Sequence, residues 1–148
     1  MIPKTDEKLI NILLVDDDPR NLVVLESILD SSDYHLTKAQ SGQEALMALL
    51  NQDFALLVLD IEMPGMNGQE TLKRIRANPA LREVPVVMMT GVADEDQMKL
   101  AAVNGANSYT IKPANAEQFL RTVLASTNYW LTIHQSPQHH LRPEDCRR

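Results

Sequence analysis

The sequence has little of what builds covalent cross-links, membrane spans or export signals. Cys146 is the single cysteine among 148 residues, so no disulfide can form within the chain. No apolar stretch approaches the roughly 20 residues that a bilayer-spanning helix needs. Residues 1–10 also lack the apolar segment of about 7 to 15 residues that marks a signal peptide. We therefore expect a reduced, cytoplasmic protein.

An excess of basic charge is also missing. The chain has 14 Lys and Arg against 20 Asp and Glu, which gives a formal net charge of -6. Nucleic acids and anionic membranes are bound by clustered Lys and Arg, and here the basic residues are scattered. The composition therefore predicts that this chain alone binds neither nucleic acid nor membrane. Its 44% hydrophobic content is enough to bury one core of ordinary size.

Short aliphatic runs are what the chain has in abundance. The runs at 11–15, 54–59 and 84–89 show no polar alternation, which is typical of strands buried on both faces of a parallel sheet. The segments 34–39 and 107–111 are more polar. We interpret these two as further strands, the first at an edge of the sheet.

Segments with helical spacing separate the predicted strands. In residues 19–31, Leu and Ile recur at three and four residues, and Asp18 can cap this helix with Pro19 at its first position. Ser41, followed three residues later by Glu44, has the pattern of a capping box. Further helices are expected at 68–77, 94–104 and 115–126, with a left-handed stop in the segment 104–107.

This alternation of strands and helices predicts an α/β fold. Five βα units favour an open, doubly wound parallel sheet with helices on both faces and right-handed crossovers. We expect the domain to cover residues 9–126. Residues 127–148 are interpreted as a partly disordered C-terminal extension with one apolar patch around Trp130. Trp130 could fold back on the domain or join a partner surface, and both interpretations stay open.

Three consecutive carboxylates, Asp16, Asp17 and Asp18, follow the first predicted strand. Their charges repel one another, so a role as ordinary solvated surface does not explain the run fully. Acids before a proline also make a good helix start, and the run alone is therefore weak support for a binding site.

Other polar residues occupy the same kind of position. Asp60, Thr90 and Lys112 each follow a different predicted strand, and in doubly wound sheets ligands bind beyond the carboxyl ends of the strands. Clustered carboxylates are stabilised by a cation, and an all-oxygen ligand set suits Mg²⁺. The sequence therefore predicts a magnesium site at this edge.

The ordered set resembles the receiver domains of two-component response regulators. The family pattern is an acidic pair, an Asp in D-x-x-M-P-G-x-x-G, a Ser or Thr, and a Lys-Pro. Here residues 16–17, residues 60–68, Thr90 and residues 112–113 match it. The resemblance covers residues 9–126 and implies the flavodoxin-like receiver fold, with the strand order 2-1-3-4-5 of the family's chemotaxis regulator.

The resemblance also implies the role of each site residue. Asp60 would accept a phosphoryl group from a phosphohistidine of a sensor histidine kinase or phosphotransfer protein. Thr90 and Lys112 would contact that group, and Tyr109 occupies the position of the family's aromatic switch. The implied Mg²⁺ ligands are Asp17 directly, Asp16 mainly through water, Asp60, and the backbone carbonyl of Glu62. A cis peptide bond is usual before the proline that matches Pro113.

In such a family the protein signals by contact and is no enzyme beyond its own phosphotransfer and dephosphorylation. The implied output face comprises helix 4, strand 5 and helix 5, here 94–104, 107–111 and 115–126, and a homodimer stays open.

Two alternatives remain at this point. The chain could be a receiver taken from a larger hybrid kinase or effector protein. It could also be a Mg²⁺ phosphatase of the haloacid dehalogenase type, although that family has a DxDxT pattern where residues 60–64 read DIEMP. A nucleotide-binding protein is disfavoured, since neither GxGxxG nor GxxxxGK occurs.

Overall fold

The computed structural model describes residues 9–112, 117 and 120–125, and strands and helices alternate along them. The elements are β1 (Ile10–Val15), α1 (Pro19–Ile28), β2 (Tyr34–Ala39), α2 (Gly42–Asn51), β3 (Leu56–Asp60), α3 (Gly68–Ala77), β4 (Val86–Thr90), α4 (Glu95–Asn104) and β5 (Ser108–Ile111). Residues 117 and 120–125 are also helical, in agreement with the helix predicted at 115–126. None of the helices described in this way is long and apolar enough to cross a membrane.

The five strands form one parallel sheet in the order β2-β1-β3-β4-β5, as predicted. Every residue of β3 and β4 is buried, which explains why their sequences show no polar alternation. Both strands begin two residues later than the predicted ranges 54–59 and 84–89. Since Pro85 has no N–H to donate, β4 begins at Val86. Both strands also run one residue further than predicted, so that Asp60 and Thr90 are their last residues.

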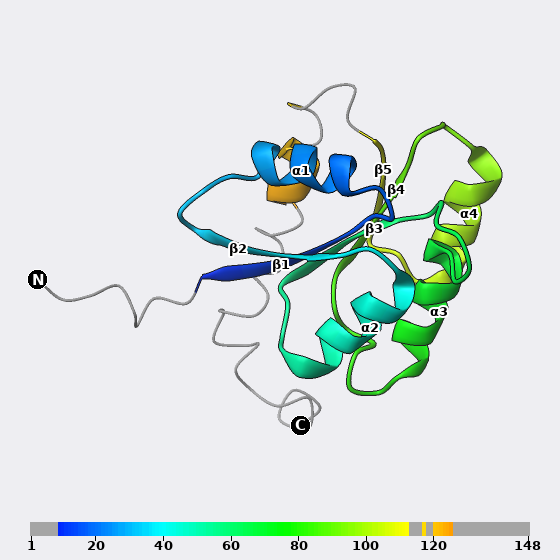
Figure 1. Cartoon of the computed structure of the whole chain (residues 1–148). Helices are drawn as coiled ribbons and strands as arrows, with labels where there is room; N and C mark the ends of the chain where they lie inside the picture. The colour runs from blue at the N-terminus through cyan, green and yellow to red at the C-terminus, as the bar shows by residue number, and fades with distance from the viewer. Residues whose placement is uncertain (1–8, 113–116, 118–119, 126–148) are drawn as a thin grey trace, which may run out of the picture.

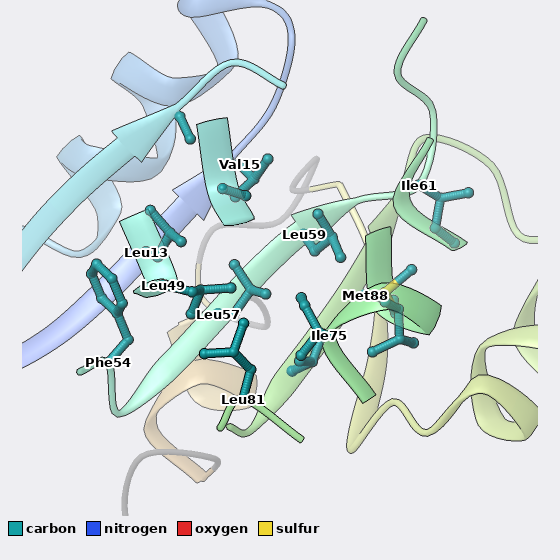
Figure 2. Close-up of a cluster of buried hydrophobic side chains, with 14 of the residues drawn as sticks. Leu13, Val15, Leu49, Phe54, Leu57, Leu59, Ile61, Ile75, Leu81 and Met88 are labelled. Atoms are coloured by element: carbon teal, nitrogen blue, oxygen red, sulfur yellow. The ribbon is translucent and has the colours of Figure 1, made fainter. Parts of the chain in front are cut away.

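Helices cover both faces of the sheet and create two apolar layers. Figure 1 shows α1 and the helical residues 120–125 on one face and α2, α3 and α4 on the other. Successive residues of a strand point to opposite faces, so Leu13 belongs to the layer under α2 and α3, whereas Leu14 belongs to the layer under α1. Figure 2 shows the first of these layers, in which Leu57 and Leu59 of β3 lie beside Ile75 of α3.

Most of the predicted helix ends are confirmed. The Asp18 carboxylate caps α1 by accepting from the Arg20 N–H at 2.9 Å. The C-cap of α4 is Gly105, whose φ of 100° is left-handed. The capping box of α2 differs in one bond. Ser41 Oγ accepts from the Glu44 N–H at 3.1 Å as expected, but the Glu44 carboxylate accepts from the N–H of Gln40, one residue before the cap.

Three further predictions concern residues outside the described part of the chain. They are the cis bond before Pro113, the packing of Trp130 and the extension at 127–148. All the peptide bonds of the described residues are trans.

Candidate functional site

Polar side chains converge where the parallel strands end. Asp60 and Thr90 are the last residues of β3 and β4, while Asp16 and Lys112 directly follow β1 and β5. These four strands are neighbours in the sheet. The chain folds so that each of these four strands brings one polar group to the same edge of the sheet, as predicted for a doubly wound sheet.

The acidic residues form a compact cluster. Asp16 and Asp60 are 0% exposed, Asp17 is exposed, and one carboxylate oxygen of each lies within 4.8 Å of the others. Asp16 Oδ1 accepts from the Asp18 N–H at 2.9 Å. Among the described residues, Asp16 Oδ2 accepts no hydrogen bond, and its partner is the Lys112 ammonium at 3.3 Å. Because three carboxylates this close repel one another, the cluster is suited to hold a divalent metal ion.

The side chain of Lys112 places a positive charge beside this cluster. Its Nζ lies 3.2 Å from Asp60 Oδ2 and 3.3 Å from Asp16 Oδ2. Partial burial disfavours the charge of Lys112, but the carboxylates of Asp60 and Asp16 outweigh this effect and raise its pKa. Lys112 is therefore a fixed positive charge between two buried acids.

Burial has a large effect on Asp60. Desolvation is the main cause that raises its pKa to about 6, and the neighbouring charge of Asp16 adds to it. The Glu62 N–H, which donates to Asp60 Oδ1 at 3.1 Å, and the Lys112 ammonium both act in the opposite direction. A bound cation favours the ionised carboxylate, so a metal ion in this cluster would lower the pKa of Asp60.

The end of β4 carries two hydrogen-bond donors beside this carboxylate. The Thr90 hydroxyl, on a buried residue, donates to Glu62 Oε1 at 3.3 Å. The Gly91 N–H donates to the same oxygen at 3.1 Å. Sequence reasoning missed these two contacts of the Glu62 side chain, since the only site contact that it gave Glu62 was a backbone carbonyl on the metal ion. The signal that could have indicated them was an acidic side chain two residues past a strand end.

Tyr109 lies on the same side of the sheet as Thr90. The register pairs Met88 with Tyr109 and Thr90 with Ile111, so the Tyr109 side chain is two residues from Thr90 along the strands. The ring packs against the same apolar layer that contains Leu13 and Ile75. Its hydroxyl is 3.5 Å from the backbone oxygen of Asp94, the N-cap of α4.

Known proteins resemble this chain in sequence and in fold. The response regulator receiver domain family matches residues 12–124. Chemotaxis protein CheY-3 of Vibrio cholerae is 38% identical over 110 residues, which cover 74% of this chain and 85% of CheY-3. The receiver domain protein of Methanospirillum hungatei JF-1 has a similar solved structure, with a TM-score of 0.75, 30% identity, and coverage of 83% of this chain and 97% of that chain.

Some relatives are much longer. Sensor protein GacS of Pseudomonas syringae pv. syringae is 29% identical over 128 residues, which cover 84% of this chain but only 14% of GacS. None of these matches supports the phosphatase alternative. The acidic cluster, the strand-end Thr and Lys and the parallel sheet agree with the match over residues 12–124, and the chain belongs to the response regulator receiver domain family of two-component signalling.

Proposed function

We propose that this receiver domain accepts a phosphoryl group on Asp60 from a phosphohistidine, and that Mg²⁺ assists the transfer. The observation that supports it most strongly is the Asp60 carboxylate itself. It is buried at the end of a fully buried strand and lies 3.2 Å from the Lys112 ammonium. A carboxylate held in one position beside a cation is suited to attack phosphorus.

The transfer exchanges one bond for another. A carboxylate oxygen of Asp60 forms a bond to phosphorus while the bond from phosphorus to the histidine nitrogen breaks, and the imidazole leaves with the electron pair. Mg²⁺, held by Asp16, Asp17, Asp60 and the Glu62 carbonyl, would supply charge neutralisation on the phosphoryl oxygens. The Lys112 ammonium neutralises further charge. The Thr90 hydroxyl and Gly91 N–H are donors for another oxygen.

The surface beside the site combines a small pocket with exposed aliphatic side chains of α1. A pocket of about 140 Å³ is lined by residues that include Asp16, Asn21, Val24 and Lys112. Val24 and its neighbour Val23 on α1 are exposed. Exposed aliphatic side chains next to the reacting carboxylate support docking of the histidine kinase or phosphotransfer protein on α1.

A second exposed apolar surface supports contact with a downstream protein. Met98 and Val103 of α4, Ile111 of β5 and Leu124 are all exposed, Val103 by 82%. These side chains belong to the elements at the β5 edge of the sheet, and exposed apolar side chains there favour contact with a protein. We propose that phosphorylation changes binding at this face, to a downstream protein or to a second receiver, and that the chain converts no substrate besides its phosphodonor.

The place of the domain in a longer polypeptide is a separate question. This chain spans 14% of sensor protein GacS. A receiver domain within a hybrid kinase would use the same site and the same chemistry. The phosphoacceptor proposal therefore holds for either arrangement.

Phosphoryl uptake from a small donor tests the proposal. We expect acetyl phosphate and Mg²⁺ to add one phosphoryl group per chain, visible as a single mass increment in intact mass spectrometry. The increment should be lost in hydroxylamine, which cleaves acyl phosphates. Continuous release of phosphate without a protein adduct would indicate a phosphatase and contradict the proposal.

A further inference from the structure

The Glu62 carboxylate occupies the two hydrogen-bond donors at the end of β4. Its Oε1 accepts from the Gly91 N–H at 3.1 Å and from the Thr90 hydroxyl at 3.3 Å. We propose that Glu62 is a positioning residue that takes the place of the phosphoryl group in the unphosphorylated protein. Phosphorylation must then displace its side chain. This inference rests on the proposed phosphorylation of Asp60.

The backbone directs both groups toward the same space. The Glu62 N–H donates to Asp60 Oδ1 at 3.1 Å, so Glu62 begins next to the reacting carboxylate. β3 and β4 are paired with Asp60 opposite Met89. Thr90 is therefore one residue beyond the partner of Asp60. A phosphoryl group on Asp60 extends over the donors that Glu62 now holds.

Charge makes this competition exclusive. An ionised glutamate is acceptor-only, as are the phosphoryl oxygens. The Gly91 N–H and the Thr90 hydroxyl each have one hydrogen to donate, so a phosphoryl group that takes both leaves none for Glu62, and the two anions repel each other. We infer that Glu62 is released into solvent upon phosphorylation, which its exposed position allows.

Displacing Glu62 should cost some binding free energy, but too little to prevent phosphorylation. Glu62 is exposed and its bond to Thr90 is long, so the contact is worth about as much as one ordinary hydrogen bond. A net contribution of about 1 kcal/mol corresponds to a factor of about 5 in affinity. Glu62→Ala should therefore bind the phosphoryl analogue beryllofluoride, in Mg²⁺, at least about 5-fold more tightly than wild type.

Two further variants separate displacement from a general charge effect. Glu62→Gln keeps an acceptor oxygen of the same reach but loses the charge, and we expect an affinity between those of wild type and Glu62→Ala. Glu95→Gln removes an exposed carboxylate from the first turn of α4. It should bind beryllofluoride as wild type does.

The experiment combines beryllofluoride titration with the amide NMR signal of Gly91. In the protein without Mg²⁺ or analogue, the Gly91 proton should lie downfield in wild type and move upfield in Glu62→Ala, because the bond to the carboxylate is gone. In saturating analogue the two proteins should give the same Gly91 signal. The Glu95→Gln signal should follow wild type throughout.

The two claims fail in distinguishable ways. A wild type that takes up one phosphoryl group or analogue, combined with a Gly91 signal and affinity unchanged in Glu62→Ala, overturns the role of Glu62 alone. Equal gains in Glu62→Gln and Glu62→Ala would assign the effect to charge and also overturn it. Failure of every protein to bind analogue or phosphoryl group would overturn the proposed function, and this inference with it.

Discussion

Lys112 Nζ lies 3.2 Å from Asp60 Oδ2, which places the ammonium against the carboxylate that we propose as phosphoacceptor. The same nitrogen is 3.3 Å from Asp16 Oδ2. One side chain at the end of β5 therefore stabilises the negative charges that β1 and β3 bring to the rim. Its removal has consequences for stability and for phosphorylation.

Lys112→Met should destabilise the protein by on the order of 3 kcal/mol at neutral pH in chelator, because removing one partner leaves buried charge uncompensated. The loss should be smaller in an Asp60→Asn background, where one of the two carboxylates is already neutral. A double-mutant cycle of urea unfolding measures this coupling. Equal losses in both backgrounds would show that Lys112 and Asp60 do not interact.

The raised pKa of Asp60 predicts a specific pH dependence. Burial raises this pKa to about 6 from 3.8, so between about pH 4 and pH 6 the folded protein binds more protons than the unfolded chain. The stability contributed by the protonated form is thus lost as the pH rises through about 6. At 1.36 kcal/mol per pKa unit the loss is on the order of 3 kcal/mol.

This pH effect is best isolated by difference, since other carboxylates titrate in the same range. In chelator, the free energy of unfolding of wild type minus that of Asp60→Asn should fall between pH 4 and pH 7. Asp53→Asn, at an exposed residue before β3, serves as the matched control. A difference between wild type and Asp60→Asn that does not vary with pH would contradict the assigned pKa.

Mg²⁺ should stabilise the folded protein through the acidic cluster. A ligand that binds the folded state at 100 times its Kd stabilises it by about 2.7 kcal/mol, so saturating Mg²⁺ should raise Tm by several degrees. Asp17→Asn should lose most of this increase, while Asp53→Asn keeps it. A full increase in Asp17→Asn would exclude Asp17 as a ligand.

Thr90 and Tyr109 should respond to phosphorylation together. We expect Thr90→Ala to accept a phosphoryl group but to transmit little change to Tyr109, because the hydroxyl that follows the phosphoryl group is missing. The ring signals of Tyr109 in NMR, recorded with and without beryllofluoride, measure this coupling. Equal Tyr109 responses in wild type and Thr90→Ala would disprove it.

Val103 tests the proposed output face. Val103→Glu places a charge on the exposed apolar surface of α4 and should weaken phosphorylation-dependent association, measured by sedimentation and by capture of a downstream protein. Uptake of the phosphoryl group should stay within about 2-fold of wild type. Met47→Glu, at an exposed apolar residue of α2, should change neither property.

The order and type of the elements could be predicted because each carries a strong local pattern. Unbroken aliphatic runs predict buried parallel strands, and recurring Leu at three and four residues predicts helices. The residues at which the strands begin and end were harder to predict. Apolar character extends back to Phe54 and Val84, but the strands begin at Leu56 and Val86.

The position of the site followed from topology, because parallel strand ends meet at one edge. The direction of a side chain does not follow from such a pattern. Glu62 illustrates this limit, since only the structure shows its carboxylate on Thr90 and Gly91.

Arg76 of α3 also illustrates this limit. Its guanidinium donates to the backbone oxygens of Gly105 and Val84 at 2.9 and 2.7 Å. Burial lowers its pKa. Such long-range contacts depend on which elements lie side by side, which residue spacing does not encode.

The most direct measurement is hydroxylamine-sensitive phosphoryl uptake by Asp60→Asn compared with Asp53→Asn and wild type. All three proteins are incubated with acetyl phosphate and Mg²⁺, after circular dichroism has shown that each is folded. Intact mass spectrometry should show one phosphoryl group on wild type and Asp53→Asn and none on Asp60→Asn. A folded Asp60→Asn protein that still gains the group would contradict the assignment of Asp60 as phosphoacceptor.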